Sequence, residues 1–371
     1  MSKILTAIGL MSGTSLDGID ASIIQSDGDQ ELKLIENNYI SYDSKTISDI
    51  VSLKDKIISL QHINKNIHII EILEKKITLL HVEAVKKIIE KSNIGIEDID
   101  VIGFHGQTIY HNFKEKISLQ LGDGHLLSKE INKKVIYNFR KNDIKNGGQG
   151  APLTPIFHKL LQKKMKLELP VVFVNIGGIA NLTYISNKGN ILSFDSGPGN
   201  CLIDKYVKIK SNNNISLDLN GEIAQKGNCN KVILESFLND PFYLIEPPKT
   251  LDVNDFSLSK IRGLSFEDSV TTLTELTCQS IINSFSNFKE KPKKIILVGG
   301  GRKNKYIYDR IKHLTKINTV NIDELNQQGD FIESQAFGYL SIRSFLNKPI
   351  TYPSTTGVKF PCTGGDLVDI K

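Results

Sequence analysis

A strand, a turn of small residues and a returning strand occur twice in this 371-residue chain, and this duplication restricts the fold more than any other feature. The first copy begins near residue 3, turns through residues 9–20 and returns to residue 24. The second begins near residue 170, turns through 177–181 and returns to residue 185. A further strand pattern follows each returning strand. Literal identity between the halves is slight, so we interpret the duplication as a repeat of architecture.

The length of the chain exceeds that of one ordinary core and predicts two domains, both of the α/β class. We place the boundary near residue 150, in a glycine-rich loop, which gives domains at 1–150 and 151–371. Apolar residues recur at helical spacing through 44–92, and an amphipathic helix is predicted at 266–288 with Ser265 as its N-cap. The last predicted helix spans 331–346 and is assigned to the second domain.

Composition narrows the classes of function. With 40% hydrophobic and 23% charged residues, the chain has the balance of a globular protein. The net charge of +5 comes from lysines spread along the whole chain, whereas a nucleic-acid footprint would need them clustered. Four separated cysteines argue against a zinc site or disulfide framework and fit a reducing cytosol. No apolar run approaches the roughly 18 residues of a membrane helix. We therefore expect a cytoplasmic protein without a nucleic-acid or membrane partner.

The turn between the first two strands offers backbone N–H groups and the hydroxyls of Ser12, Thr14 and Ser15, a combination that suits phosphate oxygens. We expect Gly13 and Gly18 to supply the positive φ values of a tight hairpin. The carboxylates of Asp17 and Asp20 would repel a phosphate unless a Mg²⁺ ion lay between them. An ordinary polar hairpin is the alternative for this stretch taken alone.

Three glycine-rich turns each follow a strand, at Gly13–Gly18, Gly197–Asn200 and Gly299–Asn304. Neither G-x-x-x-x-G-K-[ST] nor G-x-G-x-x-G is present, so the chain is not a P-loop NTPase or an obvious dinucleotide binder. Hairpins from two halves that close on one set of phosphates are a different solution to nucleotide binding. In this interpretation the third turn lies against the adenine and ribose.

A set of motifs in fixed order resembles the anhydro-N-acetylmuramic acid kinase family, from residue 9 to about residue 357. The motifs are Gly-Leu-Met-Ser-Gly-Thr-Ser-Leu-Asp-Gly-Ile-Asp at 9–20, Gly-Phe-His-Gly-Gln-Thr at 103–108, Phe-Arg-x-x-Asp at 139–143, Gly-Gly-Gln-Gly-Ala-Pro-Leu at 147–153, Asn-Ile-Gly-Gly-Ile-Ala-Asn-Leu-Thr at 175–183, Phe-Asp-Ser-Gly-Pro-Gly-Asn at 194–200 and Gly-Gly-Gly-x-x-Asn at 299–304. The resemblance implies two actin-like (ribonuclease-H-like) domains, each with a duplicated mixed sheet flanked by helices, and an ATP cleft between them.

The resemblance also implies a reaction. The family uses ATP and Mg²⁺ to open 1,6-anhydro-N-acetylmuramic acid with water and to phosphorylate its 6-oxygen, giving N-acetylmuramic acid 6-phosphate during recycling of the bacterial cell wall. It further implies a homodimer. Two other readings on the same scaffold stay open: an ATP-driven clamp of the chaperone or filament type, for which 371 residues leave no room for a peptide-binding domain, and a phosphoanhydride hydrolase. ATP turnover with and without the anhydro-sugar separates them.

By position, Asp195 matches the family's catalytic base. Its sequence context, Asp-Ser-Gly-Pro-Gly, is also a good turn, which is the structural alternative. The predicted ATP-binding residues are Gly13, Thr14, Ser15, Leu16, Asp17, Gly18, Ile19, Asp20, Gly197, Gly199, Asn200, Gly300, Gly301 and Asn304, with Asp17 as the metal ligand. The predicted sugar-binding residues are Arg140, Glu333, Gln149 and His105.

Each sugar-binding assignment has a structural alternative: an ion-pair partner for Arg140, a solvated helix-start carboxylate for Glu333 and a packed core histidine for His105. Asp143 is equally open between orienting Arg140 and a general structural role. The chain departs from the family's usual residues with Ser196 for Thr, Val298 for Cys and Ser334 for Ala.

Overall fold

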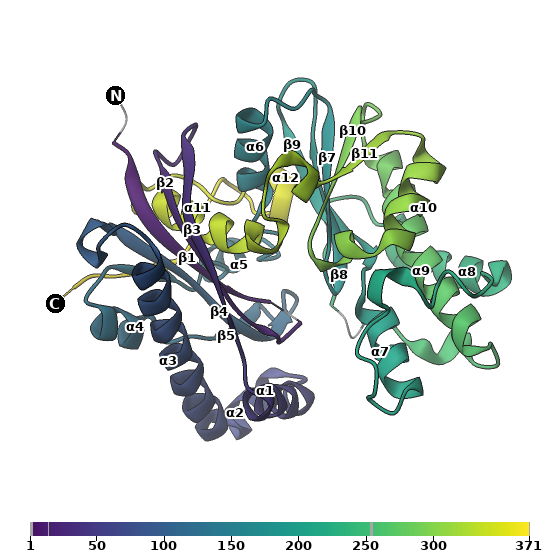
Figure 1. Cartoon of the computed structure of the whole chain (residues 1–371), viewed down its shortest axis with the longest axis horizontal. Coiled ribbons are helices and arrows are strands. Elements are labelled where there is room, and N and C mark those ends of the chain that lie inside the picture. Colours follow the sequence, from purple (N-terminus) through teal and green to yellow (C-terminus); the bar gives the residue numbers. More distant parts are fainter. Residues whose placement is uncertain (1–2, 14, 253–254, 371) are drawn as a thin grey trace. The chain divides into compact units, whose positions relative to one another are not determined.

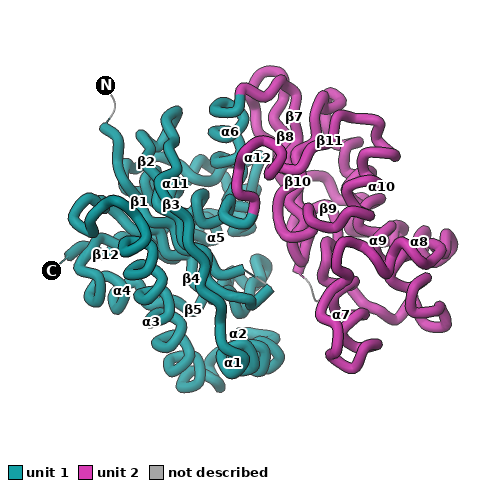
Figure 2. The backbone as a smooth tube through the Cα atoms, in the orientation of Figure 1, with its two compact units in different colours: residues 1–165, 330–371 teal, residues 166–329 magenta. Residues whose placement is uncertain are grey.

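The structure is a computed structural model that describes residues 3–13, 15–252 and 255–370 (Figure 1). The chain divides into two compact units (Figure 2): unit 1 comprises residues 1–165 and 330–371, and unit 2 comprises 166–329. The predicted boundary near residue 150 differs from this division. The predicted assignment of residues 330–371 to the second domain also differs, because the helix at their start packs on the sheet of unit 1.

The sheet of unit 1 has the strand order β12-β6-β4-β1-β2-β3, with β5 paired to β4. Strand β1 runs antiparallel to β2 and parallel to β4, and β4 runs parallel to β6. The strands are β1 (Leu5–Ser12), β2 (Gly18–Ser26), β3 (Leu32–Ser41), β4 (Val101–Asn112), β5 (Ile117–Leu121), β6 (Val135–Tyr137) and β12 (Asp366–Val368).

Helices cover both faces of this sheet, and β1, whose alternate side chains point to opposite faces, is buried along its whole length. On β1, Ile8 and Leu10 join the core beneath α1 and α3, whereas Gly9 faces α11. The predicted helical block at 44–92 forms three helices. The helices of unit 1 are α1 (Ser44–Lys56), α2 (Leu60–Lys65), α3 (Ile67–Lys91), α4 (Gly124–Ile131), α5 (Lys141–Lys145), α6 (Pro155–Lys164), α11 (Ile332–Phe345) and α12 (Pro353–Thr356).

Unit 2 repeats the same strand order. Its sheet runs β11-β10-β7-β8-β9, with β7 antiparallel to β8 and parallel to β10. Strand β7 therefore has the place of β1, and β10 the place of β4. The strands are β7 (Val171–Ile176), β8 (Ile179–Ile185), β9 (Ile191–Pro198), β10 (Lys294–Val298) and β11 (Asn318–Asn321). The predicted fold class, α/β with duplicated mixed sheets flanked by helices, is confirmed.

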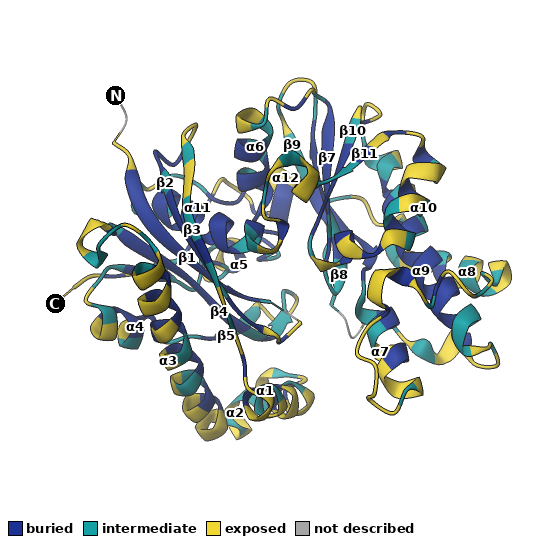
Figure 3. Ribbon diagram, viewed as in Figure 1, coloured by how far each residue is buried: buried dark blue, intermediate teal, exposed yellow. Residues whose placement is uncertain are grey.

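A central helix of unit 2, α9 (Phe266–Asn283), is buried around much of its circumference, as the dark ribbon in Figure 3 shows. The predicted cap forms, because the Asp268 N–H donates to Ser265 Oγ at 3.1 Å. The α-helix ends at Asn283, and a 3₁₀ turn continues it to Asn287. The other helices are α7 (Cys201–Lys210), α8 (Lys231–Leu238) and α10 (Lys305–Thr315). Within the described residues, no helix has the length and apolar character to cross a membrane.

We expect Gly9→Ala to destabilise unit 1 by about 3 kcal/mol, the upper end of the usual cost of overpacking, because the atoms it would meet belong to the backbone. A methyl group at Gly9 would overlap the Ser334 carbonyl oxygen and the Gly338 backbone nitrogen on α11. Urea unfolding measures the effect. Gly300→Ala is the matched control, since its Cβ would meet nothing within 4 Å among the described residues. A loss for Gly9→Ala below about 0.5 kcal/mol, the usual range of surface changes, would contradict this account of the packing.

Candidate functional site

The hairpin between β1 and β2 is the first predicted site. Thr14 lies outside the described residues. Contrary to expectation, neither Gly13 nor Gly18 has a positive φ; among the described residues of the turn it is Leu16 that is left-handed, with φ of 61°. Gly18 is required for another reason, because a Cβ there would overlap the Ile40 carbonyl oxygen. At Gly13 the nearest described atom to a Cβ would be Ser15 Oγ, at an ordinary 3.4 Å.

A buried polar chain supports the start of this hairpin. The Tyr42 hydroxyl donates to Ser12 Oγ at 3.0 Å, and Ser12 Oγ lies 2.9 Å from His81 Nε2. Burial lowers the pKa of His81 to about 4, so its ring is neutral. Its Nδ1 faces the Ile77 carbonyl at 2.8 Å and must donate, which leaves Nε2 to accept from Ser12. Ser12 is thereby held at the last position of β1.

The hairpin also concentrates negative charge. Ser15 Oγ donates to Asp17 Oδ1 at 2.7 Å, and the Tyr39 hydroxyl donates to the Asp17 carbonyl at 2.8 Å. Burial and the charges of Asp17 and Asp20 raise the pKa of Tyr39. Across the described part of the chain, no group of three or more His, Cys, Asp or Glu residues could hold a metal alone. A cation at Asp17 would therefore need ligands from elsewhere, such as phosphate oxygens and water.

Three of the predicted sugar-binding residues converge in unit 1. Arg140 Nη1 donates to the Gly150 carbonyl at 2.7 Å, and Arg140 Nη2 lies 3.0 Å from His105 Nε2. Burial, and then the charge of Arg140, hold the pKa of His105 well below its usual value. Its Nδ1 meets the Gly106 carbonyl at 2.8 Å, so Nδ1 donates and Nε2 accepts from Arg140. Gln149 precedes Gly150 in the same loop.

Asp143 holds this loop from its other side. Asp143 Oδ1 accepts from the Gly150 N–H at 2.7 Å, and Asp143 Oδ2 accepts from Thr356 Oγ1 at 2.5 Å. Gly150, with φ of 73°, is thus fixed at its N–H by Asp143 and at its carbonyl by Arg140. Sequence reasoning assigned no chemistry to the tail that carries Thr356. The structure brings that tail to the loop, since the Gln149 N–H donates to the Thr356 carbonyl at 2.8 Å.

Glu333, the fourth predicted sugar-binding residue, lies in the first turn of α11 and is partly exposed. Phe337 follows four residues later and therefore lies on the same helix face. The Phe337 ring packs on His105, with ring centroids 4.5 Å apart. The face of α11 that carries Glu333 thus turns toward the cluster of His105 and Arg140.

In unit 2, Asp195 lies in β9 and is 7% exposed. Its N–H donates to the Lys249 carbonyl at 2.9 Å, and its Oδ2 accepts from the Leu251 N–H at 2.8 Å. Lys249 is itself buried. Its Nζ donates to the carbonyl of Phe242 at 3.1 Å and lies 4.4 Å from the centre of the Phe242 ring. Burial lowers the pKa of this ammonium group.

Sequence reasoning missed this segment, residues 241–251, as part of the Asp195 surroundings. Its polar residues and prolines give no periodic pattern; the one available signal was the Pro247–Pro248 pair beside a lysine. The segment also reaches the loop after Asp195. The Tyr243 hydroxyl lies 2.9 Å from Ser280 Oγ, and both would crowd a side chain at Gly197.

The Gly197–Asn200 segment, which includes the last two residues of β9, packs against the turn between β7 and β8. The Gly199 N–H donates to the Gly178 carbonyl at 2.9 Å, and the Asn200 N–H donates to the Gly177 carbonyl at 2.8 Å. These two N–H groups therefore already have partners within the unit. Gly177 itself resembles Gly13, because a Cβ there would meet its nearest described atom at 3.5 Å. The β7–β8 turn occupies the place in its sheet that the β1–β2 hairpin has in unit 1.

The third turn follows β10. Gly299 has φ of 78°, and a Cβ at either Gly299 or Gly301 would overlap the end of β7. Gly300 between them is different: its φ lies outside the left-handed region, and a Cβ would meet no described atom within 4 Å. Asn304 caps α10, its Oδ1 accepting from the Ile307 N–H at 3.2 Å. Packing in the described structure therefore explains two of the three glycines, and not Gly300.

The sequence model for anhydro-N-acetylmuramic acid kinase matches residues 5–369 of the chain. The chain belongs to this family. A relative from Pelagibacter ubique (strain HTCC1062) is 48% identical over 378 residues, covering 99% of each chain. One from Agrobacterium fabrum (strain C58 / ATCC 33970) is 37% identical over 380 residues, covering 99% of this chain and 100% of its own. Both carry the name anhydro-N-acetylmuramic acid kinase, so the resemblance in the motifs is confirmed.

We expect acid to destabilise unit 1 of this family member between pH 6.5 and about 4. Burial lowers the pKa of His81 and His111 to about 4 and that of His158 to about 3. Because these folded-state pKa values are depressed, the unfolded chain binds protons first, and stability present above pH 6.5 is lost as the pH falls.

Urea unfolding at several pH values measures this loss. His158→Gln should reduce the dependence of the unfolding free energy on pH by about 1.4 kcal/mol per pH unit near pH 5. His68→Gln, an exposed change on α3, is the control. An unchanged dependence in His158→Gln would show that His158 is not a buried neutral group.

Proposed function

We propose that this protein uses ATP to open 1,6-anhydro-N-acetylmuramic acid with water and to phosphorylate its 6-oxygen, yielding N-acetylmuramic acid 6-phosphate for cell-wall recycling. The observation that carries the proposal is the family match over residues 5–369, which includes every motif that surrounds the candidate site. A cytoplasmic location and a homodimer are proposed on the same family grounds. An ATPase without a sugar acceptor, the alternative, receives no support from the named relatives.

Asp195 is proposed as the general base. An anhydro bridge has no free 6-hydroxyl, so water must attack the anomeric carbon while the released 6-oxygen attacks the γ-phosphate. A carboxylate that takes the proton of this water contributes typically ~10²–10⁴-fold. The buried Asp195 carboxylate suits this task, because the Leu251 N–H at 2.8 Å fixes Oδ2 and so limits the rotation of the group.

For the nucleotide, we propose contacts from turns in each unit. Unit 1 contributes the hairpin at Gly13–Asp20, and unit 2 contributes the turn at Gly299–Asn304 together with Gly197–Asn200. We add Gly177 of the β7–β8 turn, because its place in the duplicated sheet equals that of the first hairpin. At Gly13, Gly177 and Gly300, neither φ nor packing among the described residues demands glycine. A ligand that lies close to the backbone is a physical reason for glycine at such positions.

For the sugar, we propose Arg140, His105, Gln149 and Glu333. The planar guanidinium of Arg140 can pair with the lactyl carboxylate of the sugar through two parallel hydrogen bonds. His105 is proposed to orient Arg140, since its neutral Nε2 accepts from Nη2 at 3.0 Å without neutralising the arginine.

Mg²⁺ is proposed at Asp17. The oxygen ligands of the hairpin fit this ion, which is commonly held by one or two carboxylates, phosphate oxygens and water. When bound, it would reduce the negative charge on the transferring phosphate. Asp17 would hold the ion, and the nearby Asp20 carboxylate would add to its attraction.

The test is ADP release with and without 1,6-anhydro-N-acetylmuramic acid, in water labelled with heavy oxygen. We expect ADP release to require the anhydro-sugar and the sugar phosphate to carry one solvent oxygen. Asp195→Asn should lower kcat by about 10²–10⁴-fold while leaving the Kd for ATP unchanged. Glu290→Gln, an exposed carboxylate change in the same unit, is the control. ADP release that ignores the sugar would contradict the kinase, and retained turnover in Asp195→Asn would remove that residue from the role of base.

We expect Gly300→Ala to raise the KM for ATP by about tenfold, equivalent to about 1.4 kcal/mol. The added methyl group would project into space that no described side chain fills, where we propose the adenosine lies. The KM for the sugar and the unfolding free energy should stay unchanged. Steady-state kinetics at varied ATP measures the effect; an unaltered KM for ATP would place the adenosine elsewhere.

A further inference from the structure

We propose that Arg302 is a positioning residue for the nucleotide: bound to Asp323, it fixes the backbone of the Gly299–Gly301 turn. The inference rests on the proposed function, in which that turn contacts the adenosine. Position 302 stands at an unspecified position of the family motif Gly-Gly-Gly-x-x-Asn, so neither the motif nor the family match assigns it a role.

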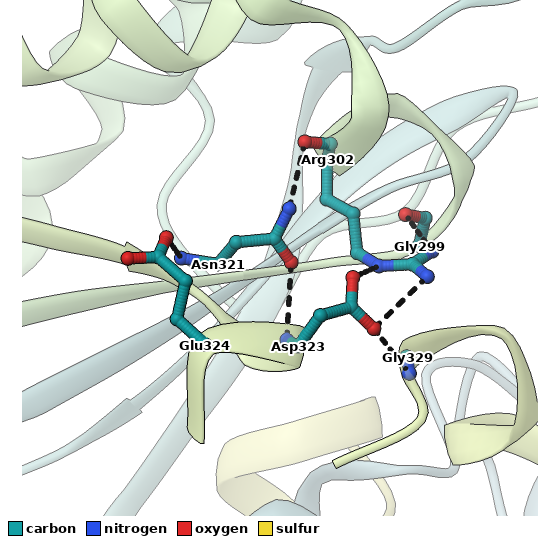
Figure 4. A network of polar contacts seen from close by, with 6 residues as sticks. All are labelled: Gly299, Arg302, Asn321, Asp323, Glu324 and Gly329. Carbon is teal, nitrogen blue, oxygen red and sulfur yellow. Dashed lines mark hydrogen bonds and ion pairs between the residues drawn. The ribbon is translucent and has the colours of Figure 1, made fainter. Parts of the chain in front are cut away.

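Figure 4 shows the network that carries this proposal. The Arg302 side chain is 2% exposed. Its Nη1 donates back to the carbonyl of Gly299 at 3.0 Å, and its Nε donates to Asp323 Oδ2 at 2.7 Å. A longer contact joins Nη2 and Asp323 Oδ1 at 3.3 Å. The guanidinium therefore bridges the first residue of the turn to a carboxylate on another element.

That carboxylate is well placed to act as an anchor. Asp323 lies in the 3₁₀ helix η8 (Ile322–Leu325), which follows β11, the neighbour of β10 in the sheet. Its Oδ1 also accepts from the Gly329 N–H at 2.7 Å. Asn321 closes the network, since its Nδ2 donates to the Arg302 carbonyl at 3.1 Å and its Oδ1 accepts from the Asp323 N–H at 3.2 Å. Both the side chain and the backbone of Arg302 are thus fixed.

The turn needs such a restraint because its glycines are conformationally free. Gly299 holds a left-handed φ of 78°, and Gly300 has open space where a side chain would be. Without the hydrogen bond from Nη1 to the Gly299 carbonyl, ordering the turn around a nucleotide would cost backbone entropy at binding. With Arg302 in place, the turn is already ordered when the protein folds, so this backbone entropy is not lost when the nucleotide binds.

A substitution at Gly329 is a second, independent way to disturb the position of the Arg302 guanidinium. A Cβ at Gly329 would overlap Nε of Arg302, whereas its φ lies outside the left-handed region and tolerates alanine. Gly329→Ala should therefore displace the guanidinium without removing any charge.

Two further variants change the bridge itself. Arg302→Lys removes the planar fork while keeping the charge, and Asp323→Asn removes the charged acceptor.

A second arginine–carboxylate pair in unit 2 provides the control for a purely structural role. Arg310 Nε donates to the buried Glu275 Oε1 at 2.5 Å, in the helix layer, and the structure shows no bond from this pair to the glycine turn within the described residues. If Arg302 only stabilised the fold, Arg302→Lys and Arg310→Lys would behave alike.

The experiment measures, for each variant, the melting temperature, the KM for ATP, the KM for the anhydro-sugar and the Kd for ATP. We expect Arg302→Lys, Asp323→Asn and Gly329→Ala each to raise the KM and Kd for ATP about tenfold with the KM for the sugar unchanged. Arg310→Lys should lower the melting temperature alone. The double variant Arg302→Lys/Asp323→Asn should weaken ATP binding no more than either single change, because both act through one bridge.

Two outcomes would overturn the inference: an unaltered Kd for ATP in Gly329→Ala and Arg302→Lys, or an equal effect of Arg310→Lys. Gly300→Ala separates this failure from failure of the proposed function. If Gly300→Ala weakens ATP binding and the Arg302 variants do not, the turn binds nucleotide and Arg302 does not position it. If the unaltered protein releases no ADP with the anhydro-sugar, the proposed function itself fails.

Discussion

The close approach of backbone to backbone is the constraint on which the rest of this structure depends. Helix α11 can lie this close to β1 because Gly9 carries no side chain at the contact, and the space at Gly338 on the helix is also tight. That contact brings a segment more than 300 residues away in sequence onto the first strand. Through it, Phe337 reaches His105, and the face that carries Glu333 turns toward Arg140. The candidate sugar-binding cluster is thus a consequence of how tightly one helix packs on one sheet.

The glycines of the turns separate into groups with different physical causes. Gly150 and Gly299 have left-handed φ values, and Gly18 and Gly199 are demanded by neighbouring backbone atoms. For Gly300, neither cause applies among the described residues. A sequence shows all of these as the same letter. The structure shows which glycines the fold itself explains, and the unexplained ones are the better guides to a ligand.

The repeated pattern of strand, turn and strand predicted both sheets from sequence, because period and turn residues are local properties. Three features could not be predicted in this way. The division of the chain depends on α11 packing far from its sequence neighbours. Among the described residues of the first hairpin, Leu16 has the left-handed φ, where glycine seemed the natural choice. The segment that holds Asp195 through Lys249 and Leu251 lacks any periodic pattern. The division of the chain and the Asp195 segment depend on long-range contacts, which local sequence does not encode, and the side chain of Leu16 is buried in unit 1.

The arginines illustrate how the same residue type serves different ends. Arg302 is bound by the Asp323 carboxylate, and this ion pair compensates the charge of the arginine. What Arg302 contributes is therefore the fixed direction of its N–H donors. Two of the contacts of Arg140 are instead with uncharged acceptors, a carbonyl and a neutral imidazole. His105 must be neutral for this, because an imidazolium would present a second N–H to the guanidinium. Burial secures that state, so the imidazole accepts from Arg140 without placing a charge of either sign beside it.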